Sequence, residues 1–211
     1  MRIIVWDLDE TILDTGRLFK LADERVSREA DMSVKDVRDI RRRIARINFT
    51  FHAWFDALGI DPYLFSRLEQ ELTAELSALA PVCVYPGVRQ IIEMHDPSRE
   101  THVLLTAGDP AHQVWKFSLL GLHEYFEVRH RHVVPRNASK ANVLARYFGY
   151  GQVIFIDNQP DWHAEVLEQG IGVTQIRPRW PDSSTAEPHH HDGVRWHVVD
   201  SPEELVELLR K

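Results

Sequence analysis

Short apolar runs of strand length alternate with segments of helical periodicity along most of this 211-residue chain. This alternation is typical of α/β proteins, in which helices join parallel strands and cover both faces of the sheet. We therefore expect a Rossmann-like parallel sheet with helices on both faces. The candidate strands are residues 3–6, 102–105, 153–156 and 172–175, and a weaker candidate spans residues 128–134.

Capping residues mark where several helices begin and end. Asp109, followed by proline, is an N-cap, and Gly121 ends the helix that it opens. The run Ser-Pro-Glu-Glu that starts at Ser201 is a capping box, so a C-terminal helix is expected after it. Asn137 is expected to cap a further helix that runs towards Phe148.

One long segment breaks the alternation, because residues 18–79 show helical periodicity only. The segment lies between the first strand and the next βα unit. We therefore predict an α-helical cap subdomain, residues 17–80, inserted into an α/β core made of residues 1–16 and 81–211. Leucines recur at helical spacing in the second half of the segment, at Leu64, Leu68, Leu72, Leu76 and Leu79.

The composition fits an ordinary globular protein and argues against several other classes. Apolar residues make up 44% of the chain, and no apolar stretch reaches the roughly 18 to 20 residues that a membrane helix needs. The start lacks the plan of a signal peptide, so a cytoplasmic protein without a membrane partner is expected. The net charge of −7 argues against general nucleic-acid binding. The single cysteine, Cys83, is expected to be a buried, unreactive thiol.

Acidic residues follow two of the candidate strands. Asp7 comes directly after the first strand, and Asp9 lies on the same face of an extended chain two residues later. Asp157 follows the strand at residues 153–156, and Asp161 comes four positions further on. The carboxyl ends of parallel strands open on one crevice, so these carboxylates are expected to lie together. Their mutual repulsion would require a hard divalent cation among them, and carboxylate oxygens favour Mg²⁺.

Two further segments are expected to reach the same crevice. Thr106 ends another strand and is followed by Ala107 and Gly108, whose backbone N–H groups can approach the oxygens of a phosphate. Lys140 would lie in the first turn of the helix capped by Asn137, where the helix dipole disfavours a cation. An anionic partner, either the aspartate cluster or a bound phosphate, would compensate this charge.

Together these residues resemble the motifs of the haloacid dehalogenase-like superfamily of hydrolases. The run WDLDETI at residues 6–12 resembles the first motif, D-x-D-x-T, and VLLTAG at residues 103–108 resembles the second, a strand that ends in threonine or serine. Lys140 resembles the lysine of the third motif, and FIDNQPD at residues 155–161 resembles the acidic fourth motif. The order and spacing fit over about residues 1–178, and the helical insertion falls where capped members carry theirs.

The resemblance implies phosphoryl transfer to an aspartate. Asp7 would be the nucleophile that attacks phosphorus and forms an aspartyl-phosphate. Asp9 would protonate the leaving oxygen and then take a proton from the water that hydrolyses the intermediate. Lys140 would neutralise charge on the nucleophile and on the transferring group.

The resemblance also implies how substrate and metal are held. Thr106, with the amides of Ala107 and Gly108, would hold the phosphoryl oxygens. A Mg²⁺ cofactor would be bound by the acids of the first and fourth motifs, through the Asp7 carboxylate, the Asp9 backbone carbonyl, Asp157 and Asp161.

Several functions on this scaffold stay open at this point. Dehalogenating relatives lack an acid two residues after the nucleophile, so Asp9 favours phosphate chemistry. A phosphotransferase or mutase would use the same residues with a hydroxyl group as acceptor. A non-catalytic binding protein on this scaffold predicts the loss of at least one motif residue. The expected substrate is a small phosphomonoester, because a helical cap over the crevice excludes a folded phosphoprotein.

Other features have less specific interpretations. Residues 48–54 are either substrate contacts or packing within the cap, and the arginines at residues 41–43 and Arg46 are expected to lie on a solvated helix face. Lys116 is expected to be exposed on a helix. The histidines at residues 189–191 lie in an expected surface loop and are not expected to bind a metal, because consecutive side chains diverge. The oligomeric state is not predicted.

Overall fold

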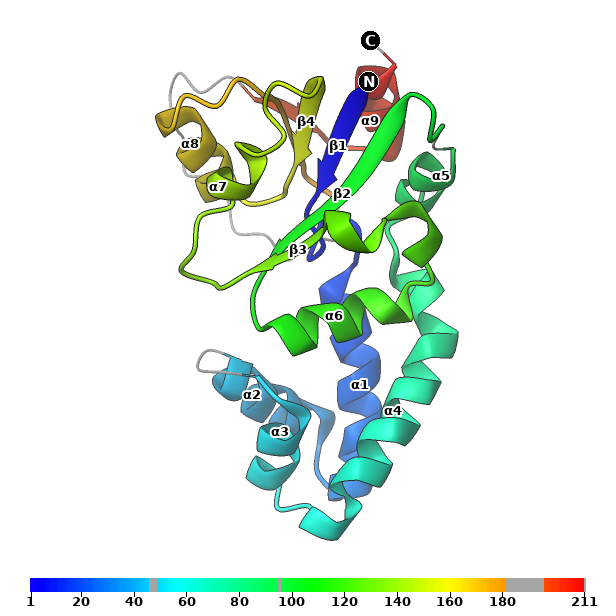
Figure 1. Cartoon of the computed structure of the whole chain (residues 1–211). Helices are drawn as coiled ribbons and strands as arrows, with labels where there is room; N and C mark the ends of the chain where they lie inside the picture. Colours follow the sequence, from blue (N-terminus) through cyan, green and yellow to red (C-terminus); the bar gives the residue numbers. More distant parts are fainter. Residues whose placement is uncertain (46–48, 95, 181–195, 211) are drawn as a thin grey trace.

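The computed structural model describes residues 1–45, 49–94, 96–180 and 196–210. Within these ranges the strands form one parallel sheet in the order β3-β2-β1-β4-β5-β6 (Figure 1). The first strand lies in the interior of the sheet, which explains its unbroken apolar run. The strands are β1 (Arg2–Trp6), β2 (Glu100–Ala107), β3 (Arg131–Val134), β4 (Gln152–Ile156), β5 (Thr174–Pro178) and β6 (His197–Val199).

Alternate residues of the strands pack against helices on opposite faces of the sheet. On one face, Ile4 and Trp6 belong to a large apolar cluster that includes side chains of α5, α6 and α9. On the other face, Ile3 and Val5 pack with side chains of α7 and α8. This arrangement confirms the expected Rossmann-like α/β fold. The flanking helices are α5 (Val88–Glu93), α6 (Pro110–Leu119), α7 (Ala141–Leu144), α8 (Pro160–Glu168) and α9 (Pro202–Leu209).

Four helices between β1 and β2 lie together beyond the carboxyl ends of the strands (Figure 1). An ion pair ties two of them, because Arg41 of α2 donates to the buried carboxylate of Asp23 in α1 from Nε at 2.7 Å and from Nη2 at 2.9 Å. The helical insertion thus occupies the place predicted for a cap, while the exact division into residues 17–80 and the core stays a prediction. These helices are α1 (Thr15–Ala30), α2 (Val34–Ala45), α3 (Phe51–Ala57) and α4 (Phe65–Leu79).

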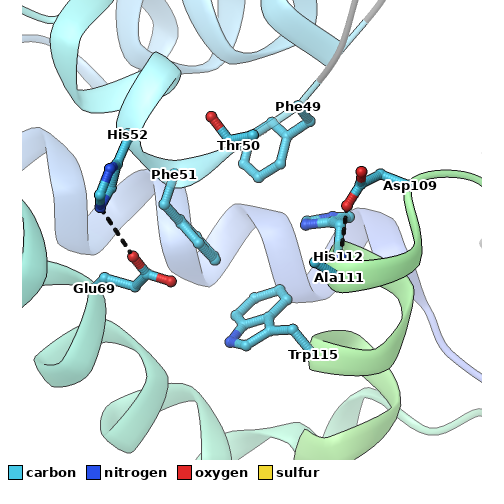
Figure 2. A pocket seen from close by; sticks show the side chains of 9 residues that line it. All are labelled: Phe49, Thr50, Phe51, His52, Glu69, Asp109, Ala111, His112 and Trp115. Carbon is cyan, nitrogen blue, oxygen red and sulfur yellow. Dashed lines mark hydrogen bonds and ion pairs between the residues drawn. The ribbon is translucent and has the colours of Figure 1, made fainter.

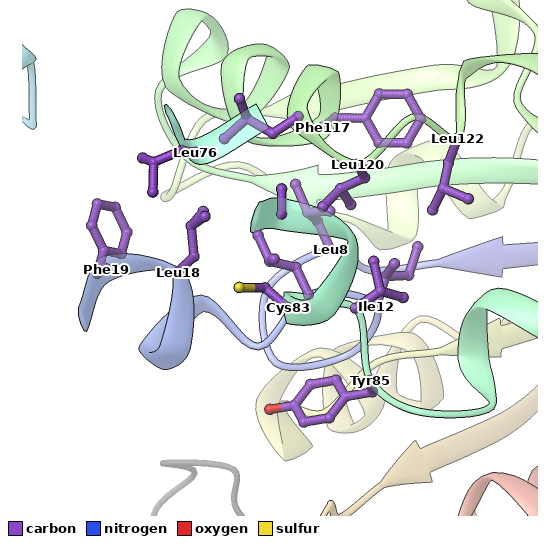
Figure 3. Packing of buried hydrophobic residues seen from close by; sticks show 14 of the residues in the cluster. Leu8, Ile12, Leu18, Phe19, Leu76, Cys83, Tyr85, Phe117, Leu120 and Leu122 are labelled. Carbon is purple, nitrogen blue, oxygen red and sulfur yellow. The ribbon is translucent and has the colours of Figure 1, made fainter. Parts of the chain in front are cut away.

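The inserted helices and the sheet domain share one apolar cluster. Figure 3 shows Leu18 of α1, Leu76 of α4 and Phe117 of α6 in this cluster together with Cys83. The Cys83 thiol is free and buried, as expected, and burial raises its pKa. Short 3₁₀ turns connect several elements, namely η1 (Pro62–Leu64), η2 (Ala80–Cys83), η3 (His123–Tyr125) and η4 (Val128–His130).

Two predicted helix starts are confirmed by their capping hydrogen bonds. The Asp109 side chain accepts from the backbone N–H of His112 at 2.9 Å and opens α6. The Ser201 hydroxyl accepts from the backbone N–H of Glu204 at 3.2 Å and opens α9. Both caps occupy a backbone N–H group that has no partner within its own helix.

The predicted helix after Asn137 was wrong in its bounds. The α7 helix begins after Lys140, extends only to Leu144 and is followed by turns. A different cap explains the late start, because the Ser139 hydroxyl accepts from the backbone N–H of Asn142 at 3.2 Å. The weak strand candidate at residues 128–134 divides into η4 and β3.

The remaining sequence expectations concern membrane helices, the histidine loop and the end of the sheet. No helix among the described residues is long and apolar enough to cross a lipid bilayer. The expected loop with the histidines at residues 189–191 lies outside the described residues, and so does Arg46. The short strand β6 was not predicted, because a run of three residues carries almost no periodic signal.

Candidate active site

Neighbouring strands end at the same level and bring their terminal side chains together. β1 lies between β2 and β4, and Trp6 is in register with Leu104 on one side and Ile156 on the other. Asp7 and Asp157 directly follow this level, and the backbone N–H of Asp7 donates to the Ile156 carbonyl at 2.9 Å. The structure therefore places these two predicted site residues side by side at the carboxyl edge of the sheet.

Lys140 lies between these two aspartates. Its Nζ atom is 2.7 Å from Oδ1 of Asp7 and 2.7 Å from Oδ2 of Asp157. All three side chains are buried. The aspartate pair is therefore the anionic partner that the sequence required for this lysine.

The charges of this buried triad influence one another strongly. Burial raises the pKa of Asp7 and of Asp157, although Lys140 acts in the opposite direction. Burial acts to lower the pKa of Lys140, but the two carboxylates outweigh it and raise this pKa. One ammonium group thus holds two carboxylates that would otherwise repel each other in a site of low dielectric constant.

Asp9 pairs with a different cation. Its carboxylate forms an ion pair with Nζ of Lys116 in α6 and accepts hydrogen bonds from Thr15 Oγ1 at 2.5 Å and Gln113 Nε2 at 2.9 Å. Burial acts to raise the pKa of Asp9, but Lys116 and these hydrogen bonds outweigh it and lower the pKa to about 2. Asp9 is therefore a fixed, ionised carboxylate in this conformation.

The expectation that Lys116 would be exposed was wrong, since only 4% of this residue is exposed. Helix geometry supplies the reason. Gln113 and Lys116 are three residues apart on α6, so they lie on the same side of the helix and both reach Asp9. The signal available in the sequence was their position four and seven residues after the Asp109 cap, which places both on one face of the helix.

Thr106 and Gly108 form a narrow turn at the end of β2. Thr106 is buried, and its hydroxyl oxygen has no hydrogen-bond partner among the described residues. Gly108 has a φ of +151°, and a Cβ atom there would lie 2.7 Å from Nε2 of Gln113, so a larger residue would have to displace the Gln113 side chain. That same Gln113 nitrogen donates to the Ala107 carbonyl at 2.7 Å and fixes the turn.

The backbone N–H of Gly108 is used within the fold. It donates to the carbonyl of Val134 at 2.8 Å. In this conformation the N–H group of Gly108 is not free to bind a ligand, and the residue contributes to the crevice by leaving room where a side chain would lie. Phosphate binding by the amides of Ala107 and Gly108 stays a prediction.

Asn158 is a site residue that the sequence analysis missed, although it directly follows Asp157. Its side chain is buried, and neither Oδ1 nor Nδ2 has a hydrogen-bond partner among the described residues. The Thr11 hydroxyl lies 3.1 Å from the backbone nitrogen of Asn158 and 3.4 Å from Oδ2 of Asp7. A buried amide oxygen without a partner, on the residue that directly follows Asp157, fits a hard cation such as Mg²⁺.

Asp161 lies apart from this buried cluster. It is exposed in the first turn of α8, and no hydrogen bond or ion pair links it to Asp7 or Asp157 in the described structure. The described residues contain no group of three histidine, cysteine, aspartate or glutamate side chains arranged to hold a metal ion. A cation here would thus need amide or backbone oxygens beside the carboxylates.

A cavity of about 910 Å³ opens between the sheet edge and the inserted helices. Asp9, Gly108 and Lys116 line it from the sheet domain, and Phe19 and Arg41 line it from α1 and α2. Arg41 lines the cavity and forms an ion pair with Asp23. The expectation that it would lie on a solvated helix face was therefore wrong. The cavity has the size and position of a small-molecule site.

Comparison with known proteins gives a family for this arrangement. A family model described as haloacid dehalogenase-like hydrolase matches residues 1–169. No curated protein matches the sequence.

Solved structures share the fold at low sequence identity. A protein from Thermotoga maritima that is named as a β-phosphoglucomutase has a TM-score of 0.65 and 19% identity, with 100% of this chain and 99% of that chain covered. The magnesium-bound HAD hydrolase YfnB from Bacillus subtilis has a TM-score of 0.64 and 17% identity, again covering 100% and 99%. An L-2-haloacid dehalogenase has a TM-score of 0.62 and 14% identity at the same coverage. Identities this low show the fold alone.

Proposed function

Because this chain belongs to the haloacid dehalogenase-like hydrolase family, we propose that it is a Mg²⁺-dependent phosphatase that hydrolyses a small phosphomonoester through an aspartyl-phosphate. The observation that carries the proposal is the buried contact of Lys140 with both Asp7 and Asp157. Such a triad puts a nucleophilic carboxylate beside a fixed positive charge, which phosphoryl transfer to an acid requires.

Asp7 is the nucleophile in this proposal. Its Oδ1 is held by Lys140, while Oδ2 has only the long contact with the Thr11 hydroxyl at 3.4 Å. Thr106, whose hydroxyl has no partner, is positioned to donate to a phosphoryl oxygen. Lys140 reduces the repulsion between the anionic nucleophile and the anionic substrate.

Asp9 supplies proton transfer. In its ionised form beside Lys116 it is suited to accept a proton from the water that hydrolyses the intermediate. To protonate the leaving oxygen, the carboxylate has to exchange its contact with Lys116 for one with the substrate. We therefore expect the Asp9 side chain to move during the catalytic cycle.

The residues present fit a Mg²⁺ cofactor. The ion would be held by the Asp7 carboxylate, the Asp9 backbone carbonyl, Asp157 and the side-chain oxygen of Asn158. Asp161, exposed on α8, would act through water. When bound, the metal neutralises charge on the transferring phosphoryl group.

Of three alternatives on this fold, two are less well supported and the third shares the same site. Carbon–halogen cleavage does not need Asp9, which here receives two side-chain hydrogen bonds and an ion pair. A non-catalytic protein does not need to keep every motif residue, and all are kept. A phosphotransferase or mutase shares the whole site and differs only in a hydroxyl acceptor. We place this activity in the cytoplasm, with no nucleic-acid or membrane partner.

The test is hydrolysis of benzyl phosphate by the purified protein with Mg²⁺, with EDTA, and after Asp7→Asn. We expect activity with Mg²⁺ only, and a loss of at least about 10³-fold in the variant. Acid quenching during turnover of radiolabelled substrate should leave phosphate on the wild-type chain and none on the variant. Activity indifferent to both EDTA and Asp7→Asn would overturn the proposal.

A further inference from the structure

A second, smaller pocket of about 250 Å³ lies between α3 and α6. Figure 2 shows aromatic rings around it, with Phe49 and Phe51 on one side and His112 and Trp115 on the other. The Phe51 and Trp115 ring centroids are 4.7 Å apart, and those of Phe49 and His112 are 4.5 Å apart. The walls of the pocket are thus packed against one another and preformed.

Most polar groups that line the pocket already have partners inside the protein. Trp115 Nε1 donates to Thr73 Oγ1 at 3.1 Å, and the Thr50 hydroxyl accepts from the backbone N–H of Ala53 at 3.0 Å. At the rim, His52 Nε2 lies 3.4 Å from a carboxylate oxygen of Glu69 (Figure 2).

The two remaining polar residues in the lining are Asp109 and His112. The Asp109 carboxylate caps α6 by accepting from the backbone N–H of His112 at 2.9 Å. Burial, reinforced by Lys116, lowers the pKa of His112 to about 4, so its imidazole is neutral at physiological pH. The pocket therefore presents a mainly aromatic surface to a ligand, and both lining carboxylates, Asp109 and Glu69, are already in contact with groups of the protein.

The pocket adjoins the large cavity of the candidate active site. Phe49, Asp109 and His112 line both spaces. Asp109 directly follows Gly108, which lies at the turn where the phosphoryl group is proposed to bind. A leaving group attached to that phosphoryl group would thus lie on the side of the turn where Asp109 lines the aromatic pocket.

We propose that this aromatic pocket binds an uncharged planar ring carried by the leaving group of the substrate. This inference rests on the proposed phosphatase function and narrows it to ring-bearing phosphomonoesters. The size is adequate, because an apolar cavity of about 150 Å³ already accepts benzene. The four rings form a continuous apolar surface, and contact with such a surface favours a flat apolar group.

Two other classes of leaving group fit less well. A polyol or sugar would bring several hydroxyl groups to a surface whose donors and acceptors are mostly occupied, and each unpaired hydroxyl costs binding energy. A quaternary ammonium group would gain from the aromatic faces, but the lining carboxylates are already used, Glu69 by His52 and Asp109 by the α6 cap.

The experiment compares benzyl phosphate, glycerol 3-phosphate and phosphocholine, whose leaving groups are all alkoxides of similar basicity. One variant fills the pocket and one serves as a matched control on the same helix. Ala111→Phe adds a ring at an exposed lining position, and Val114→Phe adds the same ring at a position that is 60% exposed and does not line the pocket.

We expect wild type to prefer benzyl phosphate by at least about tenfold in kcat/KM. Ala111→Phe should raise KM for benzyl phosphate about tenfold, with little effect on kcat or on glycerol 3-phosphate. Val114→Phe should behave as wild type. A preference for phosphocholine or glycerol 3-phosphate, or equal effects of the two variants, would overturn the inference while leaving the phosphatase function intact.

A binding measurement separates this inference from failure of the proposed function. Benzyl alcohol, the expected product, should bind saturably without Mg²⁺ and quench the fluorescence of wild type and Val114→Phe, but not that of Ala111→Phe. If the protein hydrolyses none of the three esters, this titration still decides the question. Absence of saturable binding to wild type would then show that the pocket does not bind an aromatic ring.

Discussion

Lys140 and Lys116 bind different members of the acid pair that follows β1. Lys140 is shared between Asp157 and Asp7, the proposed nucleophile, whereas Lys116 is bound to Asp9. Each buried charge has an oppositely charged neighbour, which is the condition under which charges are tolerated away from water. Removing one partner is therefore more damaging than removing both.

This asymmetry gives a first prediction for Asp9 and Lys116. Lys116→Met should destabilise the protein by about 1 to 3 kcal/mol, because it leaves a carboxylate whose side chain is only 29% exposed without its cation. The double variant Asp9→Asn/Lys116→Met should recover part of that loss. Urea unfolding of the four proteins in the cycle measures the coupling energy, expected to be above about 1 kcal/mol.

The matched control is the ion pair between Lys35 and Asp39 on α2. Their side chains are 79% and 50% exposed, so solvent screens this pair and its coupling energy should be clearly smaller than that of Asp9 and Lys116. Equal coupling energies in the two cycles would mean that partial burial of Asp9 does not strengthen its pairing with Lys116.

Among the helices, the docking of α9 depends on a glycine before α5. Gly87 has a φ of +82°, and a Cβ atom there would lie 2.5 Å from Cβ of Pro202 in the first turn of α9. Gly87→Ala should cost about 3 kcal/mol in the free energy of unfolding, from backbone strain and overpacking together.

Gly59→Ala is the control for that substitution. Gly59 also has a positive φ, +70°, but a Cβ atom there meets nothing within 4 Å, so about 1 kcal/mol of backbone strain is expected. Chemical denaturation of both variants measures the difference. If the two losses are the same, contact with α9 is not what requires glycine at position 87.

The α6 helix gives a prediction about pH. The pKa of His112 is lowered from 6.5 to about 4 by burial and by Lys116, so the folded protein resists its protonation. Above pH 6.5 the ring is neutral in both states and contributes nothing. As pH falls from 6.5 towards 4 the unfolded chain takes up the proton first, so stability is lost, by about 1 to 2 kcal/mol at pH 5.

This loss should depend on the His112 ring itself. Between pH 8 and pH 5, His112→Gln should lose about 1 to 2 kcal/mol less stability than wild type, as measured by urea unfolding. A His112→Gln curve parallel to that of wild type would exclude this histidine as a source of acid sensitivity.

For the molecule as a whole, the site lies where the sheet domain meets the helical insertion. Asp9 and Lys116 line the large cavity from the sheet domain, while Arg41 and Phe19 line it from the inserted helices. A ligand in this cavity contacts both parts, and a bound ion would offset repulsion at the sheet edge. Ligand binding to the folded state alone should thus stabilise the entire fold.

Mg²⁺ binding therefore gives a fourth prediction. At about 100 times its Kd, Mg²⁺ should raise the melting temperature by roughly 5 to 10 °C. Asn158→Ala should weaken this shift, whereas Asn137→Ala, at an exposed turn, should preserve it. Thermal unfolding at increasing Mg²⁺ checks both. Identical shifts in the two variants would mean that Asn158 does not take part in Mg²⁺ binding.

Local patterns in the sequence were sufficient for much of the fold. The apolar run before Asp7 predicted a buried strand, and the Asp109 and Ser201 caps predicted where α6 and α9 begin. These features depend on contacts between near neighbours along the chain. The bounds of α7 were mispredicted because Asn137 and Ser139 are both good caps, and only the packed structure selects one.

The amino-acid order by itself determined the parallel sheet, the helical insertion and the order of the motifs, because strand and helix periodicities and strand-end acids are local properties. Only the tertiary structure decided that Lys116 is buried against Asp9, that Asn158 lacks a partner and that an aromatic pocket forms between α3 and α6. Each of these depends on side chains that are far apart in sequence, and packing alone fixes which of them meet.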